Sequence, residues 1–428
     1  MDHFQYHRGE LHAEDTSIRA IAEAVGTPFY CYSTATLEHH YHVFQKALDD
    51  HGLGQRALIC FAVKSNSNIA VLATLAHCGA GADIVSAGEL MRALKAGIAA
   101  NKVVFSGVGK TQDEMAIALK AGIRQFNVES LAELHELNAV AASLNMIAPV
   151  SFRLNPDIDA GTHEKISTGK AENKFGIHWH EAEQAYETAA SLAHVAAHGV
   201  DIHIGSQITD LAPFAAAFEK TTALVMRLRG LGHAITTVDL GGGLGIPYQK
   251  EASPPSPADY ARIVKDSFAV PDCDLIFEPG RMISGNAGVL VTSVIRTKKG
   301  MKKNFIIVDA AMTELLRPTL YGAYHEISPV LLEHDGAKGS SDALPRWDIV
   351  GPVCETGDYI AQDRALAEPV AGDLLCVATV GAYGAVLGSS YNTRPLAPEV
   401  LVKGAEFRII RHRPSLEDML EMETIPQW

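Results

Sequence analysis

Between about residue 55 and residue 283, short apolar runs rich in β-branched residues alternate with longer amphipathic stretches. Apolar residues recur at three- and four-residue spacing in the longer stretches, which predicts helices at 69–77, 89–96 and 131–144. The short runs predict eight strands, at 57–63, 82–85, 102–105, 124–128, 150–154, 200–204, 236–240 and 274–277. Strands in this number with intervening helices fit a (β/α)8 barrel, which we favour over a doubly wound parallel sheet, the competing interpretation.

The pattern changes after Arg281. Valine- and isoleucine-rich runs separated by Gly, Pro and Asp predict an antiparallel β-domain, with strands at 289–296, 304–308, 347–350, 374–380 and 406–410. The run Thr-Pro-Phe-Tyr-Cys-Tyr at 27–32 is expected to add a strand, and the polar segment 333–343 is expected to be a surface loop. We therefore predict a barrel over 36–283 and a β-domain, formed by 1–35 and 284–428, that completes the functional site.

Composition narrows the class of protein. The chain has 428 residues with 36 basic and 50 acidic side chains, a formal net charge of -14, and such a chain without basic runs suits neither nucleic acid nor an anionic membrane. No apolar stretch approaches the ~20 residues of a membrane span, and the N-terminus lacks the apolar core of a secretory signal. The six cysteines include no C-x-x-C pair, which argues against a zinc site or a disulfide scaffold. These features favour a soluble cytoplasmic enzyme without a metal site.

Lys64 ends the first predicted strand, in Phe-Ala-Val-Lys-Ser-Asn. In a barrel, the functional face is the one where strands end and the following loops begin. Because lysine is ordinarily a solvated surface residue, this position alone leaves a surface role open. The chemical use of a lysine at such a place is a Schiff base with an aldehyde, which partial desolvation of the amine favours.

Three further strand ends carry groups suited to an anion. The sixth strand ends with His203 and is followed by Ser206, Gly241–Gly243 follow the seventh, and Gly280 and Arg281 follow the eighth. Consecutive glycines let backbone N–H groups approach a phosphate, and barrels often bind phosphate at the loops after strands seven and eight. A tight turn without a ligand is the alternative for any one of these features, but their combination favours a phosphate site.

A lysine amine beside a phosphate site indicates a phosphorylated aldehyde, and pyridoxal phosphate is the cofactor that meets this description. This cofactor also requires an acid that keeps its pyridine nitrogen protonated and a group that packs against its ring. Glu278 stands at a strand end suited to the first role, and His203 at one suited to the second. A buried glutamate must find a cation or become neutral, so a salt bridge to Arg281 is the alternative.

Several motifs together resemble one family. They are the run around Lys64, Gly-Ala-Asp-Ile-Val-Ser-Ala-Gly-Glu-Leu at 81–90, His-Ile-Gly-Ser-Gln at 203–207, the triple glycine, and Glu-Pro-Gly-Arg at 278–281. In these motifs the chain is similar to the fold-type III pyridoxal-phosphate-dependent decarboxylases, and the similarity continues over nearly the whole chain. The resemblance implies a TIM-like barrel with a C-terminal β-domain, as in alanine racemase and ornithine decarboxylase, and a homodimer whose active sites lie between subunits.

A second set of motifs is more specific. It comprises Ile-Ser-Thr-Gly at 166–169, Glu-Asn-Lys-Phe-Gly-Ile at 172–177, Arg-Pro-Thr-Leu-Tyr at 317–321, Val-Gly-Pro-Val-Cys-Glu-Thr-Gly-Asp at 350–358, Gly-Ala-Tyr at 381–383, and Tyr391-Asn392. These motifs resemble the branch of the family that decarboxylates meso-2,6-diaminopimelate to L-lysine and carbon dioxide, the last step of lysine biosynthesis. Departures from the family pattern at Asp201, Ala311 and Thr313-Glu314 bear on substrate preference rather than on reaction type.

The resemblance also implies roles for individual residues. Lys64 would form the Schiff base with the cofactor and Cys354 would donate a proton, and these two are the candidate catalytic residues. The candidate cofactor contacts are Lys64, His203, Ser206, Gly243, Glu278, Gly280, Arg281 and Tyr383. The candidate contacts to the amino-acid substrate are Arg281, Arg317, Tyr321, Glu355 and Tyr383, with Glu355 at the distal amino group. Cys354 and Glu355 would serve the site of the other subunit.

Other functions stay open. A decarboxylase of ornithine, arginine or carboxynorspermidine is the nearest alternative, although the paired Arg281 and Arg317 favour a substrate with a distal carboxylate. An amino-acid racemase of similar architecture fits the motifs less well. A non-catalytic pyridoxal-phosphate carrier would resemble the barrel alone, whereas this chain also carries Cys354, Glu355 and Tyr383. A free cysteine is usually a small buried apolar residue, but Cys354 stands in a polar loop.

Overall fold

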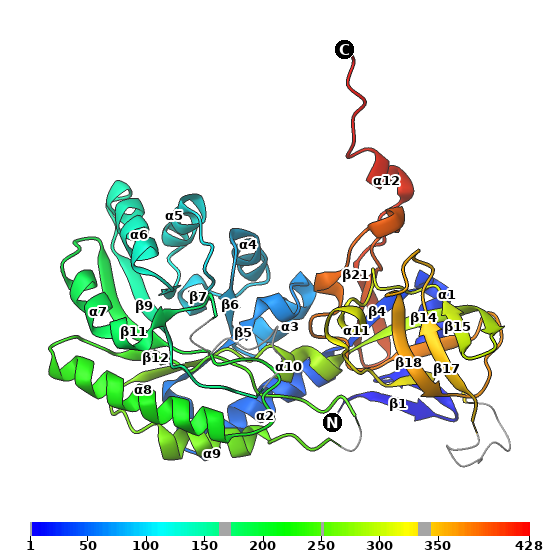
Figure 1. Ribbon diagram of the computed structural model, residues 1–428, viewed down its shortest axis with the longest axis horizontal. Coiled ribbons are helices and arrows are strands. Elements are labelled where there is room, and N and C mark those ends of the chain that lie inside the picture. The colour runs from blue at the N-terminus through cyan, green and yellow to red at the C-terminus, as the bar shows by residue number, and fades with distance from the viewer. Residues whose placement is uncertain (1, 162–172, 250–251, 333–343) are drawn as a thin grey trace. The chain divides into compact units, whose positions relative to one another are not determined.

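The computed structural model describes residues 2–161, 173–249, 252–332 and 344–428, and the chain divides into two compact units. The barrel unit comprises Glu38–Pro247 and Ser253–Ile283 (Figure 1). The β unit comprises Met1–Leu37, Tyr248–Ala252 and Ser284–Trp428. The polar segment 333–343 and the motif residues 166–172 lie outside the described residues.

The barrel unit is built around eight parallel strands that close on themselves. They pair in the order β5-β6-β7-β8-β9-β11-β12-β13, and β13 pairs back onto β5. This closure excludes the doubly wound sheet and confirms the predicted (β/α)8 barrel. The bounds are β5 Ala57–Ala62, β6 Gly81–Ile84, β7 Val103–Phe105, β8 Gln125–Val128, β9 Ala148–Asn155, β11 Val195–Asp201, β12 Thr237–Asp239 and β13 Asp274–Phe277, with a short β10, Ile177–His178, paired to the end of β9.

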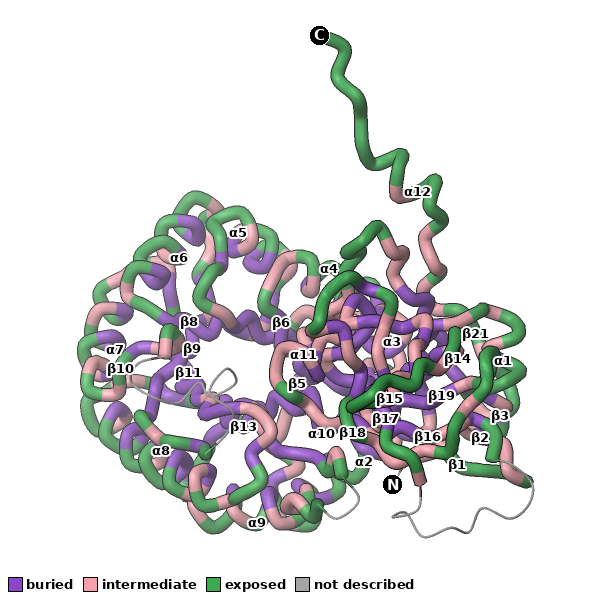
Figure 2. The backbone as a smooth tube through the Cα atoms, turned by 45° about the vertical axis from the view of Figure 1, so that its right-hand side comes forward, coloured by how far each residue is buried: buried purple, intermediate pink, exposed green. Residues whose placement is uncertain are grey.

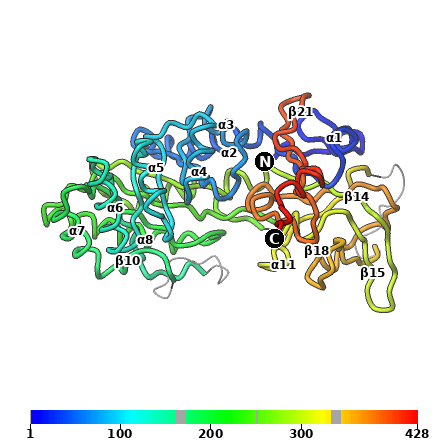
Figure 3. Tube along the Cα trace, turned by 90° about the horizontal axis from the view of Figure 1, so that it is seen from above, coloured from blue at the N-terminus to red at the C-terminus, as the bar shows by residue number. Residues whose placement is uncertain are grey.

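Helices form the outer layer of the barrel unit (Figure 1, Figure 3). Side chains fix their starts: Asn68 caps α3, Ser86 caps α4, and Thr111 caps α5 in a capping box with Glu114. Gly122 ends α5 in the left-handed conformation, at a φ of 73°. The helices are α2 Thr34–Asp50, α3 Ile69–His77, α4 Ala87–Lys95, α5 Gln112–Ala121, α6 Leu131–Ser143, α7 Ala182–Ala190, α8 Ala212–Gly230, α9 Pro257–Ser267 and the short α10 Arg281–Ser284, of which α2 and α10 cross the unit boundaries.

The barrel strands are buried on both faces, as expected for parallel strands covered by helices. Every residue of β6, β7 and β8 is buried (Figure 2). The buried set includes polar side chains near the carboxyl ends of strands, among them Asp83, Asn127 and Asp239. Buried polar groups need partners, so this edge of the barrel concentrates hydrogen-bonding groups in a dry environment.

The β unit contains a nine-stranded sheet and a three-stranded sheet among its described residues. The larger sheet is mostly antiparallel, as predicted, but β15 pairs with β17 and β4 with β20 in parallel. The strand expected near residues 27–32 is β4, and it pairs with β20 near the other end of the chain. N-terminal and C-terminal segments therefore lie side by side in this unit (Figure 3). The bounds are β1 Phe4–His7, β2 Glu10–Ala13, β3 Thr16–Ser17, β4 Phe29–Ser33, β14 Gly288–Lys299, β15 Asn304–Val308, β16 Ile327–Pro329, β17 Arg346–Val350, β18 Tyr359–Ala365, β19 Leu374–Val377, β20 Glu399–Lys403 and β21 Glu406–Arg411, with helices α1 Ile18–Val25, α11 Arg317–Tyr321 and α12 Leu416–Leu420.

The core of the β unit joins segments that are far apart in the sequence. Phe29 and Cys31 of β4 pack with Val289 and Val291 of β14 and with Val400 of β20. This packing ties the first residues of the chain to the last strands, as the assignment of both to one domain requires. In the described part of the chain, no helix combines the length and the apolar character needed to cross a membrane.

Candidate active site

Lys64 lies in a short turn, Val63–Ser65, that follows β5. Its Nζ donates a hydrogen bond to Oδ2 of Asp83 at 2.8 Å, and the lysine side chain is 33% exposed. Asp83 is fully buried in β6, where the strand register sets it beside Ala62 of β5. The candidate Schiff-base lysine therefore lies at the carboxyl edge of the barrel, with its amine held by a buried carboxylate.

Glycines after β11, β12 and β13 let three loops pack backbone against backbone. A Cβ on Gly242 would collide with the carbonyl oxygen of Glu278. A Cβ on Gly243, whose φ is +109°, would lie 2.5 Å from the carbonyl oxygen of Gly205. A Cβ on Gly280 would lie 3.0 Å from two neighbouring side-chain carbons. Only glycine fits at positions 242 and 243, where the close approach of the neighbouring loops fixes the course of the backbone at this edge.

Hydrogen bonds hold the remaining candidate cofactor contacts of the barrel unit. Nδ1 of His203 accepts from the backbone N–H of Gly242 at 3.2 Å. Desolvation, reinforced by nearby positive charges, lowers the pKa of His203 well below its usual value, so its imidazole is neutral at neutral pH. Nη2 of Arg281 donates to Oγ of Ser206 at 3.0 Å. The loops after β11, β12 and β13 thus bring the predicted residues together at one edge.

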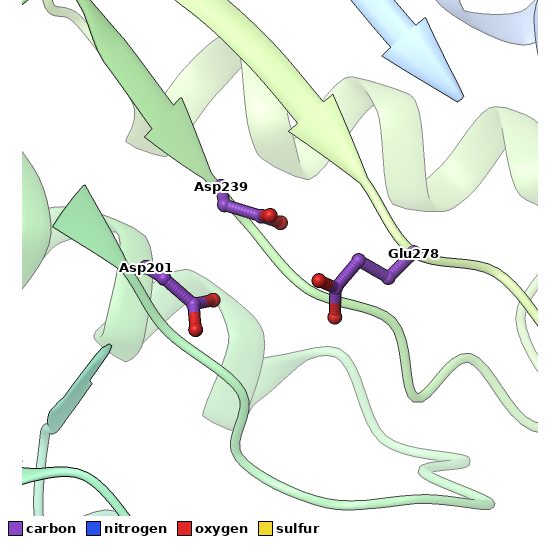
Figure 4. Close-up of side chains that lie close together, drawn as sticks. All are labelled: Asp201, Asp239 and Glu278. Atoms are coloured by element: carbon purple, nitrogen blue, oxygen red, sulfur yellow. The ribbon is translucent and has the colours of Figure 1, made fainter. Parts of the chain in front are cut away.

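Glu278 follows β13 directly and has two buried aspartates beside it. Asp201 ends β11 and Asp239 ends β12, and each of the three acids has an oxygen within 4.8 Å of the others (Figure 4). Burial and neighbouring negative charges raise the pKa of Asp239 to about 6. The same two causes raise the pKa values of Asp201 and Glu278 well above their usual range.

Other polar residues of this edge were missed in the sequence. Nη1 of Arg153 donates to Oε1 of Glu129 at 3.3 Å, and Nδ2 of Asn127 lies 3.4 Å from an oxygen of each of two clustered acids. Asp83 and Glu129 stand at or just after strand ends, so extending the strand-end rule to β6 and β8 would have found them. Asn127 and Arg153 lie inside β8 and β9, where no sequence signal marks them.

In the β unit, Arg317 begins α11 and is buried. Its Nε donates to Nε2 of His325 at 3.3 Å, and its guanidinium carbon lies 5.2 Å from the ring centroid of Tyr248 and 5.9 Å from that of Tyr321. Because Nε2 of His325 accepts, its Nδ1 carries the proton and donates to the carbonyl oxygen of Ala378, 3.0 Å away. A neutral histidine and two aromatic rings therefore fix the plane of the guanidinium.

Cys354 and Glu355 lie on an exposed loop between β17 and β18. Asp358 braces this loop: its Oδ1 accepts from the backbone N–H of Met312 and its Oδ2 from that of Val353, both at 2.6 Å. Of the six free cysteines, Cys354 is the exposed one, whereas burial raises the pKa of the four buried thiols. The candidate proton donor is therefore the thiol with the most open access to solvent.

Tyr383 adopts a φ of 57°, which is rare for a bulky side chain. It stands in a turn whose space is set by glycine, because a Cβ on Gly381 would collide with the carbonyl oxygen of Ser284. Such a strained backbone is characteristic of functional positions. The hydroxyl of Tyr391, eight residues later, donates a hydrogen bond to the carboxylate of Glu355, and both side chains are exposed.

Comparison with known proteins identifies the family of this chain. Residues 34–285 match a family model described as pyridoxal-dependent decarboxylase, pyridoxal binding domain. The chain is 51% identical over 428 residues to a diaminopimelate decarboxylase of Pseudomonas aeruginosa, a match that covers 99% of each chain. The chain belongs to the diaminopimelate decarboxylase family. This membership confirms the predicted family and makes the protein a pyridoxal-phosphate-dependent decarboxylase.

Solved members of the diaminopimelate decarboxylase family have the same fold. The enzyme from Helicobacter pylori, complexed with L-lysine, is 40% identical with a TM-score of 0.88, and the match covers 94% of this chain and 98% of that chain. The enzyme from M. jannaschii, in co-complex with L-lysine, is 34% identical with a TM-score of 0.92, covering 99% and 98%.

The barrel edge fits the cofactor of this family. The amine of Lys64 suits an aldehyde, and beside the glycine loops Ser206 and Arg281 offer a hydroxyl and a guanidinium to a phosphate. A ring nitrogen would find Glu278, and beside it Oδ1 of Asp201 is buried and accepts no hydrogen bond from the described residues. These residues supply complementary groups for the aldehyde, the phosphate and the pyridine nitrogen of pyridoxal phosphate.

Proposed function

We propose that this protein decarboxylates meso-2,6-diaminopimelate to L-lysine and carbon dioxide, the last step of lysine biosynthesis. The observation that carries the proposal is the near-complete match to relatives named diaminopimelate decarboxylase, at 51% identity over 99% of both chains for the Pseudomonas aeruginosa protein. The relatives from Helicobacter pylori and M. jannaschii were solved with L-lysine, the expected product.

Bound pyridoxal phosphate supplies an aldehyde that reacts with amines and a ring that accepts the electron pair released as a carboxylate departs as carbon dioxide. Lys64 would provide the amine that holds this aldehyde between turnovers, and Asp83 positions that amine by a hydrogen bond of 2.8 Å. Glu278 holds a proton at the ring nitrogen, because a buried carboxylate gains from an adjacent cation.

The loops after β11, β12 and β13 hold the rest of the cofactor. Ser206, Gly243, Gly280 and Arg281 provide hydroxyl, backbone and guanidinium donors suited to the phosphate. His203 would pack against the bound ring as a neutral imidazole, and its hydrogen bond from Gly242 keeps that imidazole in one orientation.

Substrate recognition rests on charge at the distal end of diaminopimelate. Arg281 and Arg317 suit carboxylates through the bidentate guanidinium fork, and Glu355 suits the distal ammonium. Tyr321 and Tyr383 complete the set of substrate contacts. Ornithine or lysine lacks the distal carboxylate and would offer no negative charge to a buried arginine, at a cost of about 3–5 kcal/mol.

Cys354 delivers the proton that replaces the departing carboxylate. Its loop is held by Asp358, whose two oxygens each accept a hydrogen bond from a backbone N–H. The backbone that carries the thiol is therefore fixed, although the thiol itself is exposed. Exposure of Cys354 and Glu355 is consistent with groups that become buried only against another surface.

The assembly and the domain division are parts of the same proposal. The chain works as a cytoplasmic homodimer in which Cys354 of the partner subunit and Glu355 of the partner subunit complete each site. The cofactor domain spans 36–283, and residues 1–35 with 284–428 form the domain that completes the active site.

The test is carbon dioxide release by the protein loaded with pyridoxal phosphate, offered meso-diaminopimelate, ornithine, arginine and carboxynorspermidine in parallel. Release from diaminopimelate alone, with an equal amount of L-lysine, is the expected result. Release from another amine would keep the chemistry of Lys64 and overturn the roles of Arg317 and Glu355. No release from any of the four would instead favour a carrier of the cofactor.

A further inference from the structure

Three acids from neighbouring strands converge at the carboxyl edge of the barrel. Asp201 and Asp239 are register partners at the ends of β11 and β12, and Glu278 follows the adjacent strand β13. Their carboxylates point toward one another, with oxygens within 4.8 Å (Figure 4). Their exposed fractions are 1%, 0% and 5%, so water contributes little to separating their charges.

Few donors reach these oxygens. Oδ1 of Asp239 accepts from the backbone N–H of Gly241 at 3.0 Å. One amide nitrogen, Nδ2 of Asn127, lies 3.4 Å from Oδ2 of Asp239 and 3.4 Å from Oε1 of Glu278. Oγ of Ser106 lies 3.4 Å from the same glutamate oxygen. These long bonds to shared donors are too few to compensate the charge of three ionised carboxylates.

Oδ1 of Asp201 is buried and has no hydrogen-bond donor among the described residues. A buried carboxylate oxygen without a donor is costly when the group is ionised. That cost disappears when the carboxyl is protonated or when a cationic ligand lies beside it.

The cations that face the cluster are committed to other acids. Arg153 of β9 pairs with Glu129 at 3.3 Å, and Lys64 pairs with Asp83 at 2.8 Å. His203, from the loop after β11, is neutral. The titratable and charged groups that face the cluster from the surrounding elements include Cys60, Lys64, Asp83, Glu129, Arg153, Tyr186, His203 and Tyr260.

This balance leaves more buried carboxylates than positive charges. Like charges this close in a dry site do not all ionise, and one proton bridges between them. Such a proton gives Asp201, Asp239 and Glu278 the missing donor and removes one negative charge from the cluster.

We propose that Asp201, Asp239 and Glu278 share one proton in the cofactor-free protein, and that this proton passes to the ring nitrogen of pyridoxal phosphate on binding. The carboxyl O–H bond breaks and an N–H bond forms at the pyridine, so the proton is neither drawn from water nor lost to it. The proposal rests on the proposed function, because it assigns the ring nitrogen to Glu278. Asp201 and Asp239 are positioning residues that act through Glu278.

The test uses pyridoxine 5'-phosphate, which carries an alcohol in place of the aldehyde and therefore leaves Lys64 chemically silent. Calorimetry in two buffers of different ionisation enthalpy measures protons taken up on binding, at a pH above the pKa of the free ring nitrogen. Wild type should take up almost none. Asp239→Asn and Asp201→Asn, each of which removes a sharing carboxyl, should take up close to one proton per site. Asp274→Asn is the matched control, because this exposed aspartate at the opposite end of β13 pairs with Arg124.

Infrared difference spectra give a second measurement that does not depend on cofactor affinity. The cofactor-free wild type, minus Asp239→Asn, should show the carbonyl stretch of a protonated carboxyl, and pyridoxine 5'-phosphate should abolish it. A full proton taken up by wild type, equal uptake by all variants, or absence of this band would overturn the proposal. Failure of the proposed function is measured separately: the wild-type protein loaded with pyridoxal phosphate would then release no carbon dioxide.

Discussion

The barrel unit and the β unit present their candidate site residues in opposite ways. In the barrel unit, Lys64 and Glu278 stand at strand ends, and buried side chains or loop backbone atoms fix their surroundings. In the β unit, Cys354 and Glu355 lie exposed on a loop whose base is tied down by Asp358, and Glu355 accepts a hydrogen bond from the exposed Tyr391.

The difference indicates how the chemistry is divided. Groups that tune a cofactor gain from low dielectric and fixed geometry, which a closed ring of strands provides. Groups that meet a substrate must admit and release it, which loops allow. Arg317 is intermediate, because it recognises substrate in our proposal yet is buried and stacked between aromatic rings.

The largest effect should come from Lys64→Ala. Without the amine at the barrel edge, turnover should fall roughly 10³-fold or more, as when a covalent group is removed. The absorbance of covalently held cofactor should vanish with it. Lys46→Ala, which removes an exposed lysine of α2, is the control and should be silent. Carbon dioxide release near the wild-type rate would remove Lys64 from the mechanism.

Cys354→Ala tests the exposed side of the comparison. The cofactor absorbance should persist because the barrel unit is untouched, while kcat should fall roughly 10²- to 10³-fold through loss of a proton donor. Cys78→Ala, at a partly exposed cysteine of the barrel unit, should keep full activity. Unchanged kcat in Cys354→Ala would show that another group supplies the proton.

Arg317→Ala tests the intermediate case. Losing a buried guanidinium that binds a carboxylate should lower kcat/KM for diaminopimelate roughly 10²-fold, and Arg317→Lys should restore little because it lacks the fork. Arg364→Ala is the matched control, since this arginine also lies over a tyrosine ring in the β unit, 3.7 Å from the centroid of Tyr324. Wild-type kcat/KM in Arg317→Ala would exclude Arg317 from substrate binding.

The smallest effect concerns stability and tests how dry the barrel edge is. Burial raises the pKa of Glu89 in α4 to about 7, although its carboxylate accepts from the backbone N–H of Val85 at 2.7 Å. Since the folded-state pKa exceeds the unfolded value, the proton favours folding at low pH, and this contribution is lost as pH rises through about 7.

In Glu89→Gln, the free energy of unfolding should therefore fall less as the pH rises through about 7. Relative to wild type, the variant should gain up to about 3 kcal/mol of unfolding free energy between acidic and mildly alkaline pH. Denaturant titrations at a series of pH values measure it. Glu114→Gln should give the opposite trend, because hydrogen bonds from the Ala87 backbone and from Thr111 lower the pKa of Glu114. Parallel curves for wild type and Glu89→Gln would show that Glu89 is hydrated.

The sequence pattern predicted the barrel strands well because each is a short buried run whose end coincides with a change to polar or glycine-rich residues. It was weaker in the β unit. Tyr359–Ala365 (β18) has exposed polar residues in its centre, and Ile327–Pro329 (β16) is too short to form a pattern. The sixth barrel strand also ends earlier than predicted, at Asp201, so His203 belongs to the following loop.

The site was predicted as positions along the chain, not as a network. Lys64, Glu278 and the glycine loops were identified because each stands at a strand end. The pairing of Lys64 with Asp83, and the convergence of Asp201 and Asp239 on Glu278, depend on strand register. Register is fixed by the closure of the ring and by side-chain packing, neither of which a single strand's residues disclose.

Gly242 contributes no functional group, yet its position limits which mutations the gene can tolerate. The codons for glycine and alanine differ by one base, so the smallest genetic event can place a methyl group against the carbonyl oxygen of Glu278. Such a change would displace the backbone of Glu278, although every catalytic and binding side chain would be unaltered. The function therefore depends on a residue without a side chain, because the carbonyl oxygen of Glu278 leaves no room for a Cβ at position 242.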